Sequence, residues 1–312
     1  MLLSAERVRE LGRLRPLRPV ADALGCWAGI IAAWTAVALW TTPWAVALAF
    51  PIVGTRFYGL FIIGHDGIHR RLLPNRRAND LFNDIVCLGP IGAITRINSR
   101  NHLLHHRHLA SEEDPDRHRH TCLNKATRSD YLAFLTGLAN LVPAVSNVFL
   151  RGGPGGGGVR SRYSARDVAV IVGWQAALVG GLTLAIGWWA YPLLWLLPVY
   201  VHTYLADMVR TFLEHSHPES DEKADEHRLI TYTSNPLERA FFAPMRMNYH
   251  TAHHLWPSIP YYNLPTADRE LRSLPGCEGL VWRRSYLGYA LRYFRALPLV
   301  ECQGERPEPR SA

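Results

Sequence analysis

The apolar residues of this chain come in long blocks, and this pattern limits the fold more than any other feature. Two blocks, 25–40 and 44–64, are separated only by a Thr-Thr-Pro break, and a second pair covers 168–187 and 188–206. A bilayer span needs about 20 predominantly apolar residues. The blocks are apolar all round, whereas helices of a soluble protein carry one polar face. The sequence therefore predicts an all-α integral membrane protein with four transmembrane helices in two hairpins.

The charges before the first block set the orientation. Arginines stand at positions 7, 9, 13, 15 and 18, and basic flanks remain on the cytoplasmic side of a membrane. A cleaved signal peptide is not expected, because the first block begins late and a second block follows at once. Since each hairpin returns the chain to its starting side, the segments after both hairpins are expected in the cytoplasm. In a bacterium the protein would lie in the inner membrane.

The same reasoning divides the chain into three parts. Residues 1–24 are expected to form a basic cytoplasmic N-terminus, 25–270 the membrane domain, and 271–312 a cytoplasmic C-terminal segment whose tail, after about Arg295, is disordered. Two further apolar stretches, 81–97 and 131–150, are interrupted by polar residues. The first is a poor span, and the second is expected to be an interfacial or re-entrant segment on the cytoplasmic leaflet. The glycine-rich stretch 151–162 lacks the GK[ST] ending of a phosphate loop and is expected to be a flexible linker.

Histidines gather in four short clusters of the sequence. They are HDGIH (His65 and His69), HLLHH (His102, His105 and His106), EHSHP (His215 and His217) and HTAHH (His250, His253 and His254). Residues three and four apart in a helix lie on one face, so each HxxHH cluster directs its rings toward one point. Neutral imidazole is a ligand for zinc, copper, iron and nickel. The two hairpins bring all four clusters to the cytoplasmic face, which predicts a metal site there.

The number of histidines indicates two metal ions. A structural zinc takes four ligands and a catalytic zinc about three, so eight or nine convergent histidines suit a two-metal site. The five cysteines are scattered without a CxxC pair, and no HExxH occurs, which disfavours a zinc ribbon, an iron–sulfur cluster and a zinc protease of that type.

Several charged residues lie beside the clusters. Asp66 and Glu214 are candidates to hold the ring nitrogen that faces away from the metal. Asp207, Arg210 and Glu214 share one helix face at the end of the fourth block, which favours an ion-pair network behind the ligands. The acidic run at 111–116 is interpreted as a loop without assigned chemistry. His202, inside the fourth block, and the isolated His108, His118, His120 and His227 are not expected to be ligands.

Other classes of protein fit less well. A metal transporter would carry its ligands within the spans, and a haem-binding membrane cytochrome needs only paired axial histidines. The net charge of +8 comes almost entirely from arginine. It suits anionic lipid headgroups, and no nucleic-acid recognition module is present.

The three main histidine clusters together resemble those of the membrane fatty acid desaturase superfamily, which includes acyl-chain desaturases and related carotenoid hydroxylases and ketolases. HDGIH is similar to its first histidine box, HLLHH to its second and NYHTAHHLWPSIPYYNLP to its third, over roughly residues 25–270. The resemblance implies four transmembrane helices with a cytoplasmic helical cap that holds a non-haem di-iron site, and it implies use of O₂ and two external electrons.

The resemblance also implies the ligands, position by position. They are His65, His69, His102, His105, His106, His250, His253 and His254, with one further ligand between the second and third boxes. We take His215 for that ligand because it directly follows the fourth block, and His217 is the alternative.

The resemblance implies the reaction class and the partners. The chain has no fused cytochrome b5 segment and no ferredoxin-like set of cysteines. Its electrons are therefore expected from a separate donor, a ferredoxin or a cytochrome b5-like protein. We rank desaturation of a fatty acyl chain, as an acyl lipid or acyl thioester, above hydroxylation or ketolation of a carotenoid or other hydrophobic substrate.

Overall fold

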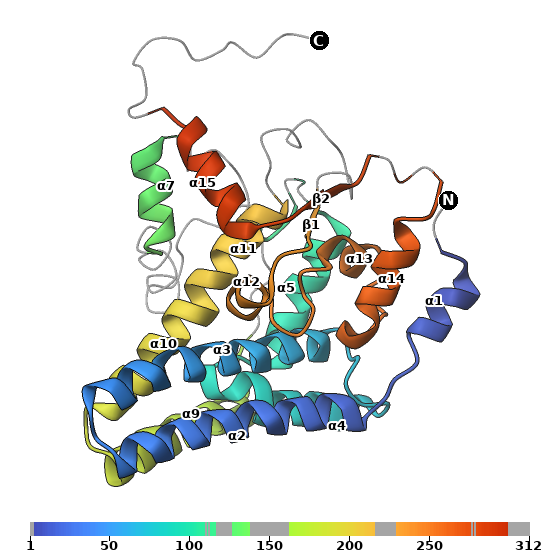
Figure 1. Cartoon of the computed structure of the whole chain (residues 1–312). Coiled ribbons are helices and arrows are strands. Elements are labelled where there is room, and N and C mark those ends of the chain that lie inside the picture. Colours follow the sequence, from blue (N-terminus) through green and yellow to red (C-terminus); the bar gives the residue numbers. More distant parts are fainter. Residues whose placement is uncertain are drawn as a thin grey trace.

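The computed structural model describes residues 3–109, 111, 113–116, 127–137, 162–215, 229–275, 277 and 279–298. These residues are mostly helical, and the strands among them form one short parallel pair (Figure 1). Most of the expected interfacial segment 131–150, the glycine-rich stretch and the tail lie outside the described residues, as do His118, His120, His217 and His227.

Three of the four predicted apolar blocks form long helices. They are α2 (Leu17–Leu39), α3 (Pro43–Ile68) and α9 (Ala165–Ala185), and each is long and apolar enough to cross a membrane. The break between α2 and α3 has a local cause. Thr42 accepts a hydrogen bond from the Ala45 backbone N–H and caps α3, while Pro43 takes a first-turn position where no N–H is needed.

The fourth block is helical but irregular. The helical backbone continues from 190 to 215 and alternates between π and α geometry. The pieces are η4 (Pro192–Leu196), α10 (Leu197–Val199), η5 (Tyr200–Leu205) and α11 (Ala206–His215). Prolines at 192 and 198 cannot donate a backbone hydrogen bond, which favours such departures from regular α-helix. The block therefore ends in a regular helix whose last residue is His215.

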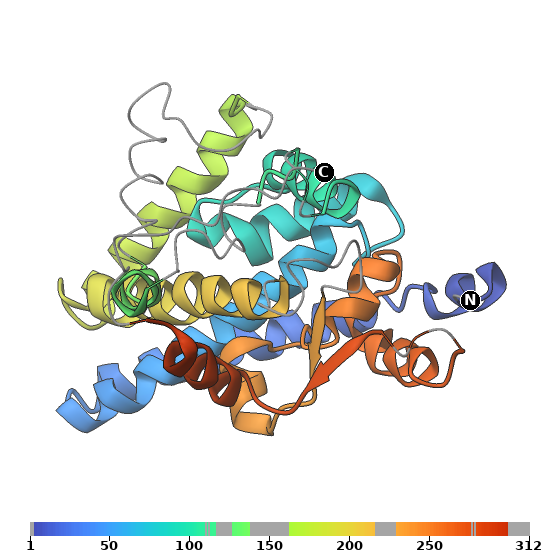
Figure 2. The same cartoon turned by 90° about the horizontal axis from the view of Figure 1, so that it is seen from above.

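Helix α3 lies at the centre of the fold. It packs against α2, against the pieces of the fourth block, and against α5 (Thr95–Arg107) and η1 (Asn83–Leu88). Seen from above, α9 and the strand pair lie on opposite sides of it (Figure 2). Asn83 in η1 donates a side-chain N–H to the Gly64 carbonyl at 2.9 Å, and Asn79 donates to the Gly67 carbonyl at 2.9 Å. These bonds fix the end of α3 where the first histidine cluster lies.

The remaining elements are short and lie mainly beyond the end of α3. They are α1 (Ala5–Leu11), α4 (Arg76–Phe82), η2 (Gly89–Ile91), α7 (Arg128–Leu135), α12 (Pro236–Phe242), α13 (His250–Leu255), η7 (Tyr261–Asn263), α14 (Leu264–Leu271) and α15 (Tyr286–Ala296). Strand β1 (Ile230–Tyr232) pairs in parallel with β2 (Val281–Arg283). The pairing anchors the chain around residues 281–296 onto the domain.

Helix α3 should tolerate no side chain at Gly54. A Cβ there would lie 2.0 Å from Nδ1 of His202, a ring held by the Pro198 carbonyl at 3.0 Å. Overpacking of this kind costs about 1–3 kcal/mol. We expect Gly54→Ala to lower the melting temperature of the purified protein by several degrees. In Gly180→Ala the new methyl meets nothing within 4 Å, so its melting temperature should not fall. Equal melting behaviour of the two variants would contradict the packing described here.

Candidate metal centre

Four helices deliver the clustered histidines to one place. His65 lies in the last turn of α3 and His69 caps its end, while His102, His105 and His106 follow one another along α5. His215 ends α11, and the short helix α13 carries His250, His253 and His254. The HxxHH spacing works as expected, because one turn of α5 or α13 separates the first and last rings of each cluster.

Five of these rings form a first group. One nitrogen from each of His65, His69, His102, His106 and His253 lies within 4.8 Å of all the others. The Nε2 atom of His102 is 2.9 Å from that of His69 and 3.0 Å from that of His106. His253 Nε2 is 3.2 Å from His106 Nε2. We call these five residues the five-histidine group.

A second group lies directly beside the first. His105, His215 and His254 also bring one nitrogen each within 4.8 Å of one another. His215 Nε2 is 3.3 Å from His254 Nε2 and 3.1 Å from His250 Nε2, so the ring of His250 adjoins the same group. We call these four residues the four-histidine group. The structure thus brings together all nine histidines that the sequence analysis selected.

The contacts between the rings fit a bound cation better than hydrogen bonds. A ring nitrogen has one in-plane position for a proton or a lone pair, yet Nε2 of His102, His106 and His215 each faces two other Nε2 atoms. Two ligand atoms about 2.1 Å from one ion are roughly 3.0 Å apart at a right angle and roughly 3.4 Å apart at the tetrahedral angle. The observed separations of 2.9 to 3.3 Å fall in this range. Two groups of neutral nitrogen donors suit two transition-metal ions.

Burial keeps these rings in the form that binds metals. The pKa of His69 is lowered to about 3, chiefly because the ring is buried and in addition because Arg71 and His105 lie near it. The pKa of His253 and that of His254 are also well below the usual value, again chiefly because the rings are buried. A neutral imidazole offers a lone pair to a metal, and a protonated one does not.

Asp114 was missed by the sequence analysis. Its two carboxylate oxygens lie 2.9 and 3.1 Å from Nδ1 of His105, and both side chains are buried. A carboxylate on Nδ1 fixes the tautomer that leaves Nε2 free for a metal. The acidic run 111–116 was interpreted as a loop without chemistry. The available signal was an acidic residue nine positions after a box histidine. Spacing alone does not show which carboxylate of the acidic run turns toward the ring.

The predicted ion-pair network is present behind the third cluster. Arg210 Nη2 lies 2.8 Å from Asp207 Oδ1, and Arg210 Nη1 lies 3.3 Å from Glu214 Oε2. Glu214 Oε2 is also 3.2 Å from Nδ1 of His250, and Glu214 accepts a 2.5 Å hydrogen bond from the Tyr286 hydroxyl. Desolvation of these buried charges is offset only because each is paired. Glu214 thereby links His250 to α15.

Asp66 has a different partner from the one expected. It accepts a 2.7 Å hydrogen bond from the backbone N–H of Tyr261. That residue follows the third cluster by seven positions, and its hydroxyl is held at 2.5 Å by Asp22 in α2. Asp66 therefore fastens the chain after α13 onto α3.

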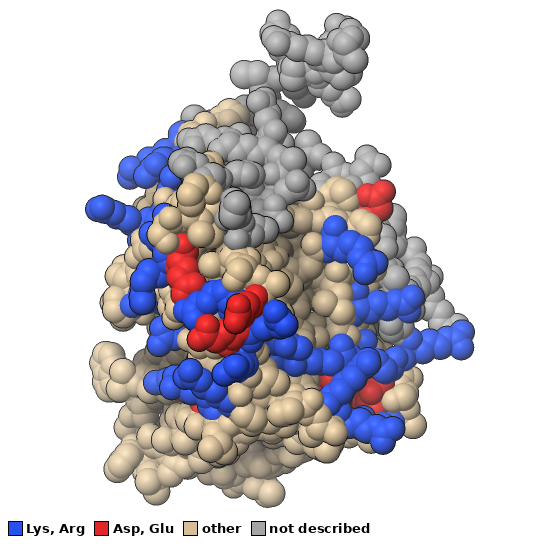
Figure 3. Space-filling model, turned by 90° about the vertical axis from the view of Figure 1, so that its right-hand side faces the viewer, with Lys and Arg blue, Asp and Glu red and all other residues tan. Residues whose placement is uncertain are grey.

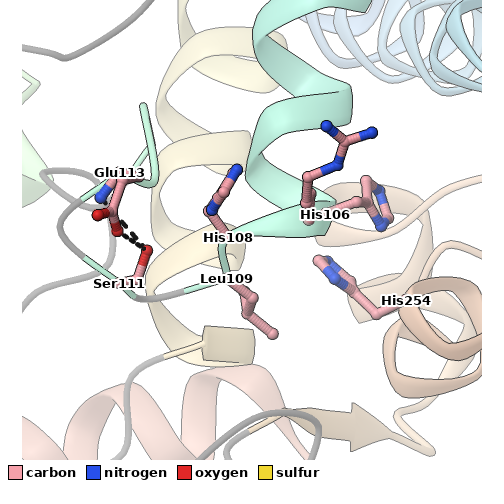
Figure 4. Close-up of a pocket in the computed structure, with 7 residues that line it drawn as sticks. His106, His108, Leu109, Ser111, Glu113 and His254 are labelled. Atoms are coloured by element: carbon pink, nitrogen blue, oxygen red, sulfur yellow. Dashed lines mark hydrogen bonds between the residues drawn. The ribbon is translucent and has the colours of Figure 1, made fainter.

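Two cavities open onto the histidines. One, of about 240 Å³, has an apolar wall of Phe61, Ile68, Leu88 and Ala93 and reaches rings of both groups. The other, of about 400 Å³, is lined mainly by polar side chains, including His108, Ser111 and Glu113, with His106 and His254 at its inner end (Figure 4). In Figure 4 the ring of His108 points away from His106 and His254. His202 lies elsewhere, with its ring against Phe50 and Phe241.

Together these features define a membrane metalloprotein whose metal centre is built from histidine clusters at the end of its long apolar helices. The family model described as "Fatty acid desaturase" matches residues 41–286, and the chain belongs to this family. It is an enzyme, an oxidoreductase.

The known relatives carry out more than one reaction. The chain is similar to a beta-carotene ketolase of Paracoccus sp. (strain N81106 / MBIC 01143), with 28% identity over 76% of this chain and 88% of that protein. It is 25% identical to an sn-1 acyl-lipid omega-3 desaturase (ferredoxin) of Nostoc sp. (strain 36), over 77% of this chain and 71% of that protein. A ceramide hydroxylase of Caulobacter vibrioides (strain NA1000 / CB15N) is 28% identical over 41% of this chain and 37% of that protein.

The two histidine groups make a direct prediction about metal content. His253→Ala and His105→Ala each remove one ring from a group, so the purified variants should hold clearly less metal than the unaltered protein. His108→Ala is the matched control, because His108 lies in the chain beside the second cluster but in neither group. Metal is measured per chain by mass spectrometry after purification in detergent. Full metal content in His105→Ala and His253→Ala would remove both groups from consideration as metal sites.

Proposed function

We propose that this enzyme binds two iron ions and uses O₂ and electrons from a separate protein to oxidise C–H bonds of a long hydrophobic substrate. The observation that carries the proposal is the division of nine clustered histidines into two adjoining groups. The proposed ligands are His65, His69, His102, His106 and His253 for one iron and His105, His215, His250 and His254 for the other. Asp66, Asp207, Arg210 and Glu214 are proposed to support the ligands from behind, together with Asp114.

The protein's own residues have a defined task in this proposal. Non-haem iron, when bound, supplies the reactivity toward O₂ that cleavage of an unactivated C–H bond requires. Phe61, Ile68 and Leu88 line the cavity beside the rings, where an alkyl chain packs and water is displaced. A substrate held by such walls presents one carbon to the centre, and small displacements of that carbon change the outcome.

We further propose that the protein crosses the membrane four times and holds the metal centre in a cytoplasmic cap. The three long apolar helices and the continuous helix from 190 to 215 support two hairpins. Exposed arginines at positions 13, 15 and 18 and at 76 and 77 flank the helices. Lys and Arg side chains form a band above an uncharged lower part in Figure 3, which is typical of the level of the lipid headgroups. The domain limits 1–24, 25–270 and 271–312 are part of this proposal.

Cysteine labelling tests the topology. In a background without the native cysteines, Asn75→Cys, Ser220→Cys and Thr266→Cys should react only with a reagent that crosses the membrane, because all three positions are placed in the cytoplasm. A cysteine in place of Thr42, between α2 and α3, should react with an impermeant reagent added outside. Labelling of Ser220→Cys from the outside would reverse the assignment of the second hairpin.

For the reaction, we rank desaturation of a fatty acyl chain first. The stretch NYHTAHHLWPSIPYYNLP supports this ranking by its resemblance to acyl-chain desaturases. The second candidate is ketolation or hydroxylation of a carotenoid or other hydrophobic substrate, which is favoured by the ketolase relative with 88% of its length matched. For electrons we propose a ferredoxin or a cytochrome b5-like protein as the separate donor.

Isotope labelling separates the two reactions. Desaturation removes two hydrogens from neighbouring carbons and leaves no oxygen in the product, whereas hydroxylation and ketolation leave an atom from O₂ in it. The protein is expressed with a donor system under ¹⁸O₂ in hosts that contain acyl lipids with or without β-carotene, and the lipids are analysed by mass spectrometry. We expect new unsaturated acyl chains without ¹⁸O. An ¹⁸O-labelled alcohol or ketone without a new double bond would replace the first candidate by the second. His253→Ala, processed in parallel, should give neither product.

A further inference from the structure

The two histidine groups differ in what lies behind their rings. A ligand histidine normally donates its second ring N–H to a carboxylate, a carbonyl or water, and this partner increases the basicity of the nitrogen on the metal. In the four-histidine group, Nδ1 of His105 faces Asp114 at 2.9 Å and Nδ1 of His215 faces the Thr211 carbonyl at 2.8 Å. Nδ1 of His250 lies 3.2 Å from Glu214 Oε2, as an ionic contact.

Three of the five rings in the five-histidine group lack such support among the described residues. The Nδ1 atoms of His65, His106 and His253 are buried and have no hydrogen-bond partner there. Asp66, the carboxylate next to this group in the sequence, is turned to the Tyr261 backbone N–H. The carbonyl of His69 accepts a hydrogen bond from a cationic side chain, since Arg71 Nε lies 3.2 Å from it.

Charge adds to this difference. Asp114 and Glu214 are both buried and both face rings of the four-histidine group. Arg210 balances only part of the negative charge, because it also pairs with Asp207 at 2.8 Å. Negative charge in a water-poor site stabilises a nearby cation far more than it does in water. Negative charge therefore stabilises a divalent or trivalent ion in the four-histidine group more than it stabilises an ion in the five-histidine group.

We propose that the two metal positions are not equivalent: the ion of the four-histidine group is retained tightly by Asp114 and Glu214, and the ion of the five-histidine group is the exchangeable one. This inference rests on the proposed di-iron function. Asp114 and Glu214 are positioning residues, since they act through His105 and His250. Loss of such a partner typically reduces metal affinity 10- to 100-fold.

The order of metal loss tests the proposal without using catalysis. Full-length protein in detergent is loaded with Fe²⁺ without oxygen, and a coloured chelator in excess removes the metal over time. We expect two phases of about one iron each. His65→Ala should eliminate the fast phase and keep the slow one, which assigns the fast phase to the five-histidine group.

Charge-removing substitutions then identify the supporting carboxylates. In Asp114→Asn and Glu214→Gln the oxygen that faces the imidazole is kept and the charge is lost. We expect the slow phase to become at least tenfold faster while the fast phase keeps its rate. Asp268→Asn is the matched control, because it removes a similarly buried carboxylate that faces Arg272 and Trp282 instead of a histidine, and both of its phases should keep their rates.

The possible failures are distinguishable. An unaltered protein that holds fewer than two ions would refute the di-iron function and this inference with it. Two ions that leave in one phase would refute the inequivalence alone. If Asp114→Asn and Glu214→Gln accelerated both phases equally, or accelerated only the phase missing in His65→Ala, the assignment of the carboxylates would be overturned. Acceleration by Asp268→Asn as well would show a general loosening of the fold instead of a specific role.

Discussion

Imidazole rings whose Nε2 atoms lie in pairs 2.9 to 3.3 Å apart fit together only around a cation, and much of the structure serves to hold these rings in place. Without one, the lone pairs of the rings would face each other, and a buried polar atom that is left without a partner costs free energy. Polar contacts fix two of the segments that carry the histidines. Asn79 and Asn83 hold the end of α3, and Asp66 holds the chain after α13.

The apolar helices and the metal centre also depend on each other. A helix that crosses a bilayer satisfies its own backbone, but its ends must be satisfied by other means. Here α3 ends at His69 and the described part of α11 at His215, so these helix ends coincide with the proposed ligands. The irregular π and α geometry of the fourth block places a regular final helix, in which Asp207, Arg210 and Glu214 share the face behind the ligands.

Periodicity made much of this predictable. The apolar blocks predicted α2, α3 and α9 to within several residues at each end, and the HxxHH spacing predicted which rings share a face. The ion pairs of Arg210 followed from the i, i+3 and i+7 positions on one helix. These features are local, and a helix translates sequence spacing directly into spatial position.

What the sequence did not reveal depends on contacts between distant segments. Asp114 turns inward and its acidic neighbour Glu113 faces the Ser111 hydroxyl, a difference that no local pattern records. The Tyr286 hydroxyl reaches Glu214 across 72 positions of the chain, and it does so because β2 pairs with β1 and α15 begins directly after that strand pair. The C-terminal segment is thus part of the support of His250. Because His250 adjoins the same group as His105, an ordered segment outside the histidine clusters and a short acidic loop act on the same metal position from two sides.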